Sequence, residues 1–387
     1  MRVVLFCHSL LSDWNHGNAH FLRGVVSELA RRGHDVRVLE PVDAWSAVNL
    51  TKDHGADALE RTRRAYPLFA SVRYDLGSLD LDRALDGADL VIVHEWSETS
   101  LVRRIGARRS GGAAFRLLFH DTHHRAVTDP QAIATYELSS YDGVLAFGAA
   151  LREVYLARGW AARVYVWHEA ADTHVFRPLP EVPPAGDLVF VGNWGDGERT
   201  RAIGELVIEP ARALGLRANV FGVRYPDEAR AALAAAGIAY GGWIPNFEVP
   251  AAFAAHRVTV HVPRRPYAEV LGGIPTIRPF EALACGIPLV SAPWPDDERL
   301  FTPGEDFLVA KDGDEMEQRL RDVLSDDALA RALADRGRRT IEARHTCAHR
   351  VDELLAIARE LGAPSAPPGE ARRPREDGRK GPKETAP

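Results

Sequence analysis

The sequence predicts an α/β protein made of two doubly wound domains, each with a parallel sheet that helices cover on both faces. Short apolar runs alternate with amphipathic helical stretches from the first residue onward. The alternation pauses at 176–184, where four prolines fall within seven residues, and then resumes. The length of 387 residues is too great for one ordinary domain and suits two. A single large sheet is the alternative architecture, and the proline-rich hinge argues against it.

The first half begins with an apolar run at 3–6 that is typical of a buried strand. Apolar residues then repeat at helical spacing from Phe21 to Leu29, and this helix ends in a basic turn followed by Gly33. Because the later apolar runs are continuous rather than alternating, their sheet should be parallel and buried on both faces. The further strands expected in this half lie at 36–39, 90–93, 116–119, 144–147 and 164–167.

The second half repeats the pattern, with its first helix expected at 200–214. Its strands are expected at 188–191, 218–221, 258–262, 288–291 and 307–309. From Gly362 onward the chain is rich in proline, glycine and charge and lacks periodic apolar residues, which predicts disorder. We therefore expect a first domain at 1–178, a second domain at 179–340, a helix at 341–362 that packs back toward the first domain, and a disordered tail at 363–387.

The composition argues against several classes of protein. A net charge of −6 gives no reason to expect nucleic acid or an anionic membrane as a partner. Cys7, Cys285 and Cys347 lie far apart with no Cys-x-x-Cys pair, which suits a reducing cytoplasm and argues against structural zinc. No targeting segment is visible, and no run of about 18 apolar residues occurs that could cross a bilayer. We expect a soluble, cytoplasmic protein without a transmembrane segment.

The segment 278–291 is the most informative part of the sequence. Pro279 is expected to open a short helix that Gly286 ends, and a buried strand follows directly. This interpretation places Glu281 in the first helical turn, where the helix dipole favours a carboxylate. On the local pattern alone, Glu281 either complements that dipole or binds a ligand, and both possibilities stay open.

The same segment resembles the Glu-Ala-Met-Ala-Cys-Gly-x-Pro-Val stretch of GT-B glycosyltransferases, of family 4 in particular. Other parts of that family are matched, in the right order, by 89–96, 118–122 and 170–178. A finer resemblance, to the CgeB-like or spore-maturation-type glycosyltransferases, rests on 190–194, 273–281 and 345–354. The resemblance covers most of residues 1–360 and implies two Rossmann-like domains facing a cleft. It also implies a transferase that takes its sugar from a nucleotide-diphosphate sugar.

The resemblance implies which residues bind the donor. The family glutamate that matches Glu281 accepts hydrogen bonds from the ribose hydroxyls, a role that suits two carboxylate oxygens facing two vicinal hydroxyls. The family usually places an arginine and a lysine near the diphosphate, and the matching loop 192–201 here has arginines only, with Arg199 as the first candidate. A solvated surface arginine is the alternative for Arg199, and a plain loop glycine is the alternative for Gly17. The expected donor-binding residues are Glu281, Arg199, Arg201, Gly273, Thr276, Arg278, Gly17 and Asn18.

One departure from the family concerns the transferred sugar. Family members usually carry a second, sugar-binding glutamate eight positions before the first, and this chain has Gly273 there. We therefore expect backbone amides that the glycines leave accessible to hold the sugar.

Histidines and carboxylates gather at the expected carboxyl ends of the first-domain strands, where open parallel sheets bind ligands. We expect His94 and His120, together with Arg199, to be the catalytic residues, and a buried core histidine is the alternative for either imidazole. A catalytic zinc is disfavoured because His-x-x-His at 120–123 lacks a second cluster and His-Glu-x-x-His is absent. The Asp-x-Asp pairs at 80–82 and 312–314 do not predict a metal either, since Asp312 has the context of a helix cap. The residues expected to contact the acceptor or the sugar are His94, Glu95, His120, Asp121 and His123.

The resemblance further implies how the reaction runs. We expect retention of the anomeric configuration, no metal and no cofactor, with a donor phosphate oxygen taking the proton of the acceptor. The acceptor would be a glycan, a small molecule or a cell-envelope component, and arginines with helix-end amides would stabilise the leaving diphosphate. Two other functions stay open: a nucleotide-sugar 2-epimerase-like isomerase, which shares the fold, and a non-catalytic glycan- or nucleotide-binding protein.

Overall fold

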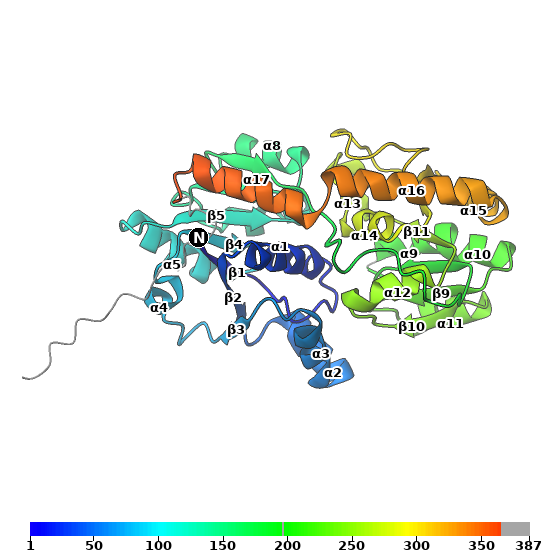
Figure 1. Cartoon of the computed structure of the whole chain (residues 1–387), viewed down its shortest axis with the longest axis horizontal. Coiled ribbons are helices and arrows are strands. Elements are labelled where there is room, and N and C mark those ends of the chain that lie inside the picture. Colours follow the sequence, from blue (N-terminus) through cyan, green and yellow to red (C-terminus); the bar gives the residue numbers. More distant parts are fainter. Residues whose placement is uncertain (196, 365–387) are drawn as a thin grey trace, which may run out of the picture.

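The computed structural model describes residues 1–195 and 197–364, which form two α/β domains lying side by side (Figure 1). The predicted disordered tail at 363–387 falls, from 365 onward, outside the described residues. Each domain is built on one sheet whose neighbouring strands all pair in parallel. The predicted fold class of two doubly wound α/β domains is therefore confirmed, and the single-sheet alternative is wrong.

The first domain has its strands in the order β3-β2-β1-β4-β5-β6-β7. Side chains alternate between the two faces of the sheet: Val4 and Phe6 join one hydrophobic core, whereas Val3 and Leu5 join another. Both faces are thus buried, as the continuous apolar runs predict. The strands are β1 (Arg2–Phe6), β2 (Asp35–Pro41), β3 (Ser71–Tyr74), β4 (Leu90–His94), β5 (Arg116–Asp121), β6 (Gly143–Ala146) and β7 (Val164–Val166). The helices are α1 (Ala19–Arg31), α2 (Trp45–His54), α3 (Asp57–Ala65), α4 (Leu81–Leu85), α5 (Thr99–Ser110), α6 (Arg125–Thr128), α7 (Pro130–Ala134) and α8 (Ala149–Ala157).

The second domain repeats this plan with the strand order β10-β9-β8-β11-β12-β13. Its strands are β8 (Leu188–Val191), β9 (Ala218–Phe221), β10 (Ala239–Gly242), β11 (Val258–His261), β12 (Leu289–Ser291) and β13 (Leu308–Val309). The helices are α9 (Gly197–Ile203), α10 (Glu209–Ala213), α11 (Asp227–Ala235), α12 (Val249–Ala254), α13 (Arg265–Glu269), α14 (Ile277–Cys285), α15 (Gly313–Ser325) and α16 (Asp327–Arg344). The last helix, α17 (Cys347–Glu360), returns to the first domain. Within the described part of the chain, no helix is long and apolar enough to cross a membrane.

The structure departs from the predicted elements where burial is incomplete or the backbone is irregular. Strands β3 and β10 were not predicted, because each is an edge strand with exposed residues rather than a continuous apolar run. The helix expected at 200–214 is interrupted by a π-helical turn at Gly204–Ile208, and Pro210, which has no N–H to donate, follows in α10. The predicted helix cap is confirmed, since the Asp312 side chain accepts from Glu315 N–H at 2.9 Å.

The chain crosses between the domains twice, and the two crossings are hydrogen-bonded to each other. The first crossing follows β7, and the second joins α16 to α17. Ala171 N–H donates to His345 O at 2.9 Å, and Cys347 N–H donates to Ala171 O at 2.9 Å. α17 then packs on α1 of the first domain (Figure 1). The two helices approach closely at Gly24, where a Cβ would collide with the Sγ of Cys347, the first residue of α17. The same Cβ would lie 2.8 Å from the Cβ of Asp172 in the first crossing.

Candidate functional site

The loops that follow the carboxyl ends of the two sheets contact each other. Asn193, after β8, donates from Nδ2 to Asn15 Oδ1, after β1, at 2.7 Å. Asp13, in the same loop as Asn15, accepts from Trp243 Nε1 at 2.9 Å and from Asn246 N–H at 3.0 Å. Because both sheets are parallel, these loops form one interdomain site at the edges where such sheets bind ligands.

Glu281 of α14 lies at the centre of a buried cluster of polar side chains at this junction. Its carboxylate is fully buried and forms an ion pair with Arg278. His20 of the first domain places Nδ1 3.5 Å from Glu281 Oε1, and Asn246 Nδ2 lies 3.5 Å from the same oxygen. Burial raises the pKa of Glu281 to about 7, and the charge of Arg278 opposes this rise. The carboxylate therefore faces side chains from both domains rather than solvent.

The start of α14 differs from the sequence prediction. The helix begins at Ile277 with Thr276 as its N-cap residue, so Pro279 lies inside the first turn and Glu281 lies beyond it. The prediction that Pro279 opens the helix and that Glu281 sits in the first turn is therefore wrong. Proline is tolerated at the third helical position because that N–H has no partner in the helix. The dipole role for Glu281 loses its basis, since the effect falls off within the first turn.

A second buried carboxylate, Glu169, lies in the same site and was not found from the sequence. It belongs to the first crossing between the domains, is 5% exposed, and accepts from Asn18 Nδ2 at 2.8 Å. Burial, and after it the charge of Glu281, raises the pKa of Glu169 to about 8. Gly17 precedes Asn18, and a Cβ at Gly17 would lie 3.4 Å from Ile277 of the second domain. Gly17 and Asn18 are thus at the interdomain junction, and donor binding by either residue stays a prediction.

The arginines predicted for the diphosphate lie in different surroundings. Arg199 of α9 donates from Nη1 to Asn193 O at 3.0 Å and from Nη2 to Val262 O at 2.8 Å, so the carboxyl ends of β8 and β11 fix its position. Arg278 is held by Glu281. The Arg201 side chain, in contrast, is 91% exposed and lies 3.9 Å from Glu205 in an ion pair on the same helical segment. The structure brings Arg199 and Arg278 to the junction and leaves Arg201 on the surface.

The glycine amide that was predicted to hold the sugar already has a hydrogen-bond partner within the second domain. Gly273 has a φ of 85°, and its N–H donates to Pro295 O at 2.6 Å. The expectation that the Gly273 amide is accessible to a sugar is therefore corrected. Thr276 contacts His261, whose Nε2 lies 3.3 Å from Thr276 Oγ1. Burial lowers the pKa of His261 to about 3, so this imidazole, which the sequence analysis missed, is neutral at the end of β11.

His94 and His120 lie at the ends of β4 and β5 but beneath the surface. Both side chains are 0% exposed, and their ring centroids are 5.2 Å apart. His94 Nε2 is 3.2 Å from Thr122 Oγ1, whereas neither ring nitrogen of His120 has a hydrogen-bond partner among the described residues. Burial lowers the pKa of His120 to about 3. These are the surroundings of core histidines, and contact with a sugar stays a prediction that requires covering side chains to move.

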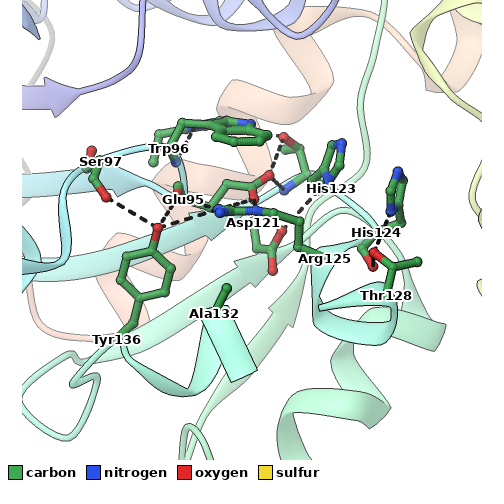
Figure 2. Close-up of polar contacts among 12 residues, drawn as sticks. Glu95, Trp96, Ser97, Asp121, His123, His124, Arg125, Thr128, Ala132 and Tyr136 are labelled. Carbon is green, nitrogen blue, oxygen red and sulfur yellow. Dashed lines mark hydrogen bonds and ion pairs between the residues drawn. The ribbon is translucent and has the colours of Figure 1, made fainter. Parts of the chain in front are cut away.

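Glu95 and Asp121 are engaged inside the first domain (Figure 2). Arg125 donates to Glu95 Oε2 from Nε at 3.1 Å and from Nη2 at 2.9 Å, and both Arg125 and Tyr136 also donate to the Glu95 carbonyl. Tyr155 donates to Asp121 Oδ2 at 2.6 Å. Both carboxylates are buried, and burial raises the pKa of each. Glu95 therefore holds the loops after β4 and β5 together, whereas Asp121 is anchored to α8. Contact of either carboxylate with an acceptor stays a prediction.

A cavity of about 330 Å³ opens between the domains beside this site. Its wall on the first domain comes from α2 and α3, and its wall on the second comes from Phe221 of β9 and the segment after β10. The His54 ring lies 4.7 Å from the Trp243 ring, and Arg61 forms an ion pair with Glu248 across the domains. Among the described residues, no group of three or more His, Cys, Asp or Glu side chains is arranged to hold a metal ion.

Comparisons with known proteins agree with this architecture. A family model described as glycosyl transferase-like matches residues 199–356. Sucrose-phosphate synthase from Thermosynechococcus elongatus is 16% identical with a TM-score of 0.65, over 93% of this chain and 99% of that one. HepE from Anabaena, solved in complex with UDP-glucose, is 13% identical with a TM-score of 0.64, over 92% of this chain and 100% of that one. A glycosyltransferase from Rickettsia africae is 11% identical with a TM-score of 0.65, over 93% of this chain and 98% of that one.

No curated protein has a sequence that matches this chain. The structural likenesses show the GT-B fold, with two Rossmann-like domains. Together with the family model, they support a GT-B glycosyltransferase.

Proposed function

We propose that this protein is a glycosyltransferase that moves a sugar from a nucleotide-diphosphate sugar to an acceptor, with retention of configuration and without a metal or cofactor. The single observation that carries the proposal is Glu281, a buried carboxylate at the junction of the two carboxyl-terminal sheet edges. The finer assignment to a family 4-like, CgeB-like enzyme belongs to the same proposal. That finer assignment rests on the resemblance of 190–194, 273–281 and 345–354. The transferase function itself is supported by the glycosyl transferase-like family model and by a structural neighbour that was solved with UDP-glucose.

Glu281 suits a ribose because one of its oxygens is poorly satisfied. Arg278 holds Oε2 in the ion pair, whereas the contacts of Oε1 with His20 and Asn246 are both 3.5 Å long. Hydrogen bonds of that length are weak, so Oε1 retains capacity for a better donor. A vicinal diol would supply two hydroxyl donors to the carboxylate, and charge-assisted bonds of this kind are the strong ones.

The leaving diphosphate would be stabilised by positive charge held in place. Arg199 is fixed by two backbone carbonyls at the ends of β8 and β11, so its positive charge is held in place at the junction. Arg278 adds a second charge beside Glu281. A charge that is already oriented stabilises the developing negative charge without reorganisation during the reaction. With a donor phosphate oxygen taking the proton of the acceptor, this chemistry needs no protein nucleophile.

The experiment that tests this proposal has two stages. A thermal-shift screen with UDP-, GDP-, ADP- and dTDP-glucose should raise the melting temperature with at least one donor, because a ligand that binds the folded state stabilises it by mass action. The selected donor is then incubated with the protein, with and without an extract of candidate acceptors. Transfer that requires an acceptor supports the proposal. Conversion of the donor alone would indicate an isomerase, and binding without any turnover would indicate a binding protein; either result refutes the transferase.

A further inference from the structure

A group of aromatic and imidazole rings lies on the first domain at the same interdomain edge. None of these residues is among those assigned to the donor. The group consists of His8, His16, Trp45, Trp96 and His123, and we call it the tryptophan–histidine cluster. The first two residues follow β1, and the other three follow β2, β4 and β5 in that order. These four strands are neighbours in the sheet, so the cluster runs across its carboxyl edge. That edge is where open parallel sheets bind ligands.

Each ring of the cluster contacts the next, so that the rings form a chain. The centroid of His8 lies 4.5 Å from that of Trp45, and the rings are tilted by 31°. Trp45 lies 6.2 Å from Trp96, and Trp96 lies 5.3 Å from His123, both edge to face. His16 lies 5.3 Å from His8. The cluster is therefore one connected group of rings in which His8 and His16 are buried and Trp45 and Trp96 are partly accessible.

Two features indicate that this surface meets a ligand. Trp45 and Trp96 are only half-buried, so both residues are partly accessible to solvent. His16 is 5% exposed, yet its Nε2 has no hydrogen-bond partner among the described residues, and the same holds for Nδ1 of His123. Buried polar atoms are normally satisfied, so an unpaired ring nitrogen beside an exposed aromatic face requires an explanation.

The cluster offers a ligand hydrogen bonds but no net charge. Burial lowers the pKa of His8 to about 4 and that of His123 to about 2, and burial also lowers the pKa of His16. A neutral imidazole donates at one nitrogen and accepts at the other. The guanidinium of Arg125 lies 4.1 Å from the centre of the Trp96 ring, but its charge is paired with Glu95 (Figure 2).

We propose that the tryptophan–histidine cluster is the acceptor site and that it binds an uncharged sugar ring. The proposal rests on the proposed transferase function. A pyranose has a face of C–H groups, which packs on an indole, and a rim of hydroxyls, which pair with neutral imidazoles. A phosphorylated or otherwise anionic acceptor would find no unpaired cation within the cluster. The acceptor class is thus a neutral glycan or glycoside.

The test measures acceptor binding separately from donor binding. An array of neutral and anionic glycans is probed with the wild-type protein in saturating UDP, and the best-bound neutral glycan is titrated by calorimetry. Trp45→Ala and Trp96→Ala should each weaken its binding by about tenfold or more. Trp96→Phe, which keeps an aromatic face, should retain most of the affinity. Trp160→Ala is the matched control, because Trp160 is a half-buried first-domain tryptophan that packs on Tyr155 outside the cluster.

His16→Phe separates a ligand contact from a packing role. It keeps a ring in the core and removes the unpaired nitrogen, so glycan affinity should fall while the melting temperature is held or rises. The proposal is overturned if the wild type binds only anionic glycans or none, or if the two alanine variants and His16→Phe all bind as the wild type does. UDP affinity of every variant should stay within twofold of wild type. If the wild type does not bind UDP, the proposed donor site is refuted instead. Glycan binding by the wild type and the variants would still test whether the tryptophan–histidine cluster is the acceptor site.

Discussion

Replacing Glu281 by glutamine tests the donor site most directly. The substitution keeps the side-chain volume in a fully buried position and removes only the charge. A ribose diol bound to the carboxylate would lose charge-assisted hydrogen bonds worth about 1.5–3 kcal/mol. That loss corresponds to about 10- to 150-fold weaker binding of the nucleoside diphosphate. Calorimetric titration of wild type and Glu281→Gln with UDP, or with the diphosphate that the donor screen selects, measures the ratio.

The pH dependence of this ratio gives a second, independent reading. With a pKa of about 7 in the empty site, Glu281 is about nine-tenths ionised at pH 8 and about one-tenth ionised at pH 6. The advantage of wild type over Glu281→Gln should therefore shrink roughly tenfold between pH 8 and pH 6. The comparison between the two proteins cancels the titration of the nucleotide itself.

Two controls make the result specific. A 2′,3′-dideoxy nucleotide has no hydroxyls to donate, so both proteins should bind it equally. Glu28→Gln changes another arginine-paired carboxylate, which contacts Arg32 at 2.8 Å on α1, and should leave UDP affinity unchanged. Equal affinity of wild type and Glu281→Gln for UDP at pH 8 would refute the assignment of Glu281 to the ribose.

Three further predictions concern stability. The folded pKa of Glu281 lies above its unfolded value of 4.5, so the free energy of unfolding of the wild type should fall as the pH rises from about 4.5 to above 7. The fall should exceed that of Glu281→Gln by up to roughly 3 kcal/mol, and an equal pH dependence of both proteins in urea unfolding would contradict this. Gly24→Ala should destabilise by about 1–3 kcal/mol because its Cβ meets Asp172 and Cys347 between α1 and α17, and a change below about 0.5 kcal/mol in urea denaturation would show that the helices can separate freely. His120→Phe should raise the free energy of unfolding by about 1 kcal/mol, since two unpaired nitrogens leave the core; lower turnover at unchanged stability would place this imidazole in the reaction instead.

The buried parts of the fold could be predicted from the sequence, and the edges could not. Leu188–Val191 was predicted residue for residue, because a strand buried on both faces has a continuous apolar run. Ala218–Phe221 was predicted with the same bounds although it contains Asn219 and is fully buried only at alternate residues. β3 has exposed residues and β10 contains two glycines, so neither has that signal. The start of α14 was misplaced because Pro279 is compatible with any position of the first turn, and Thr276 caps the helix earlier.

The candidate site shows the same limit. Glu281 was singled out because its segment resembles a stretch of GT-B glycosyltransferases, whereas its local pattern left a dipole role equally open. Glu169 and His261 acquire their partners, Asn18 and Thr276, only through tertiary packing, and no spacing along the chain indicates either pair. The signal available for Glu169 was its position next to the matched stretch at 170–178. His94 was placed at the right strand end, but its depth below the surface depends on side chains from other elements.

The return of α17 to the first domain has a consequence for how the chain is made. Val351, Leu354 and Ala358 of α17 complete the same hydrophobic core as Val3 and Leu5 of β1. The first domain therefore cannot bury that face until nearly the whole chain has left the ribosome. At about 5–20 residues per second, the roughly 190 residues between β7 and the end of α17 take roughly 10–40 s to synthesise. During that interval the apolar side chains of α1 and β1 that later pack on α17 stay uncovered while the second domain is being translated.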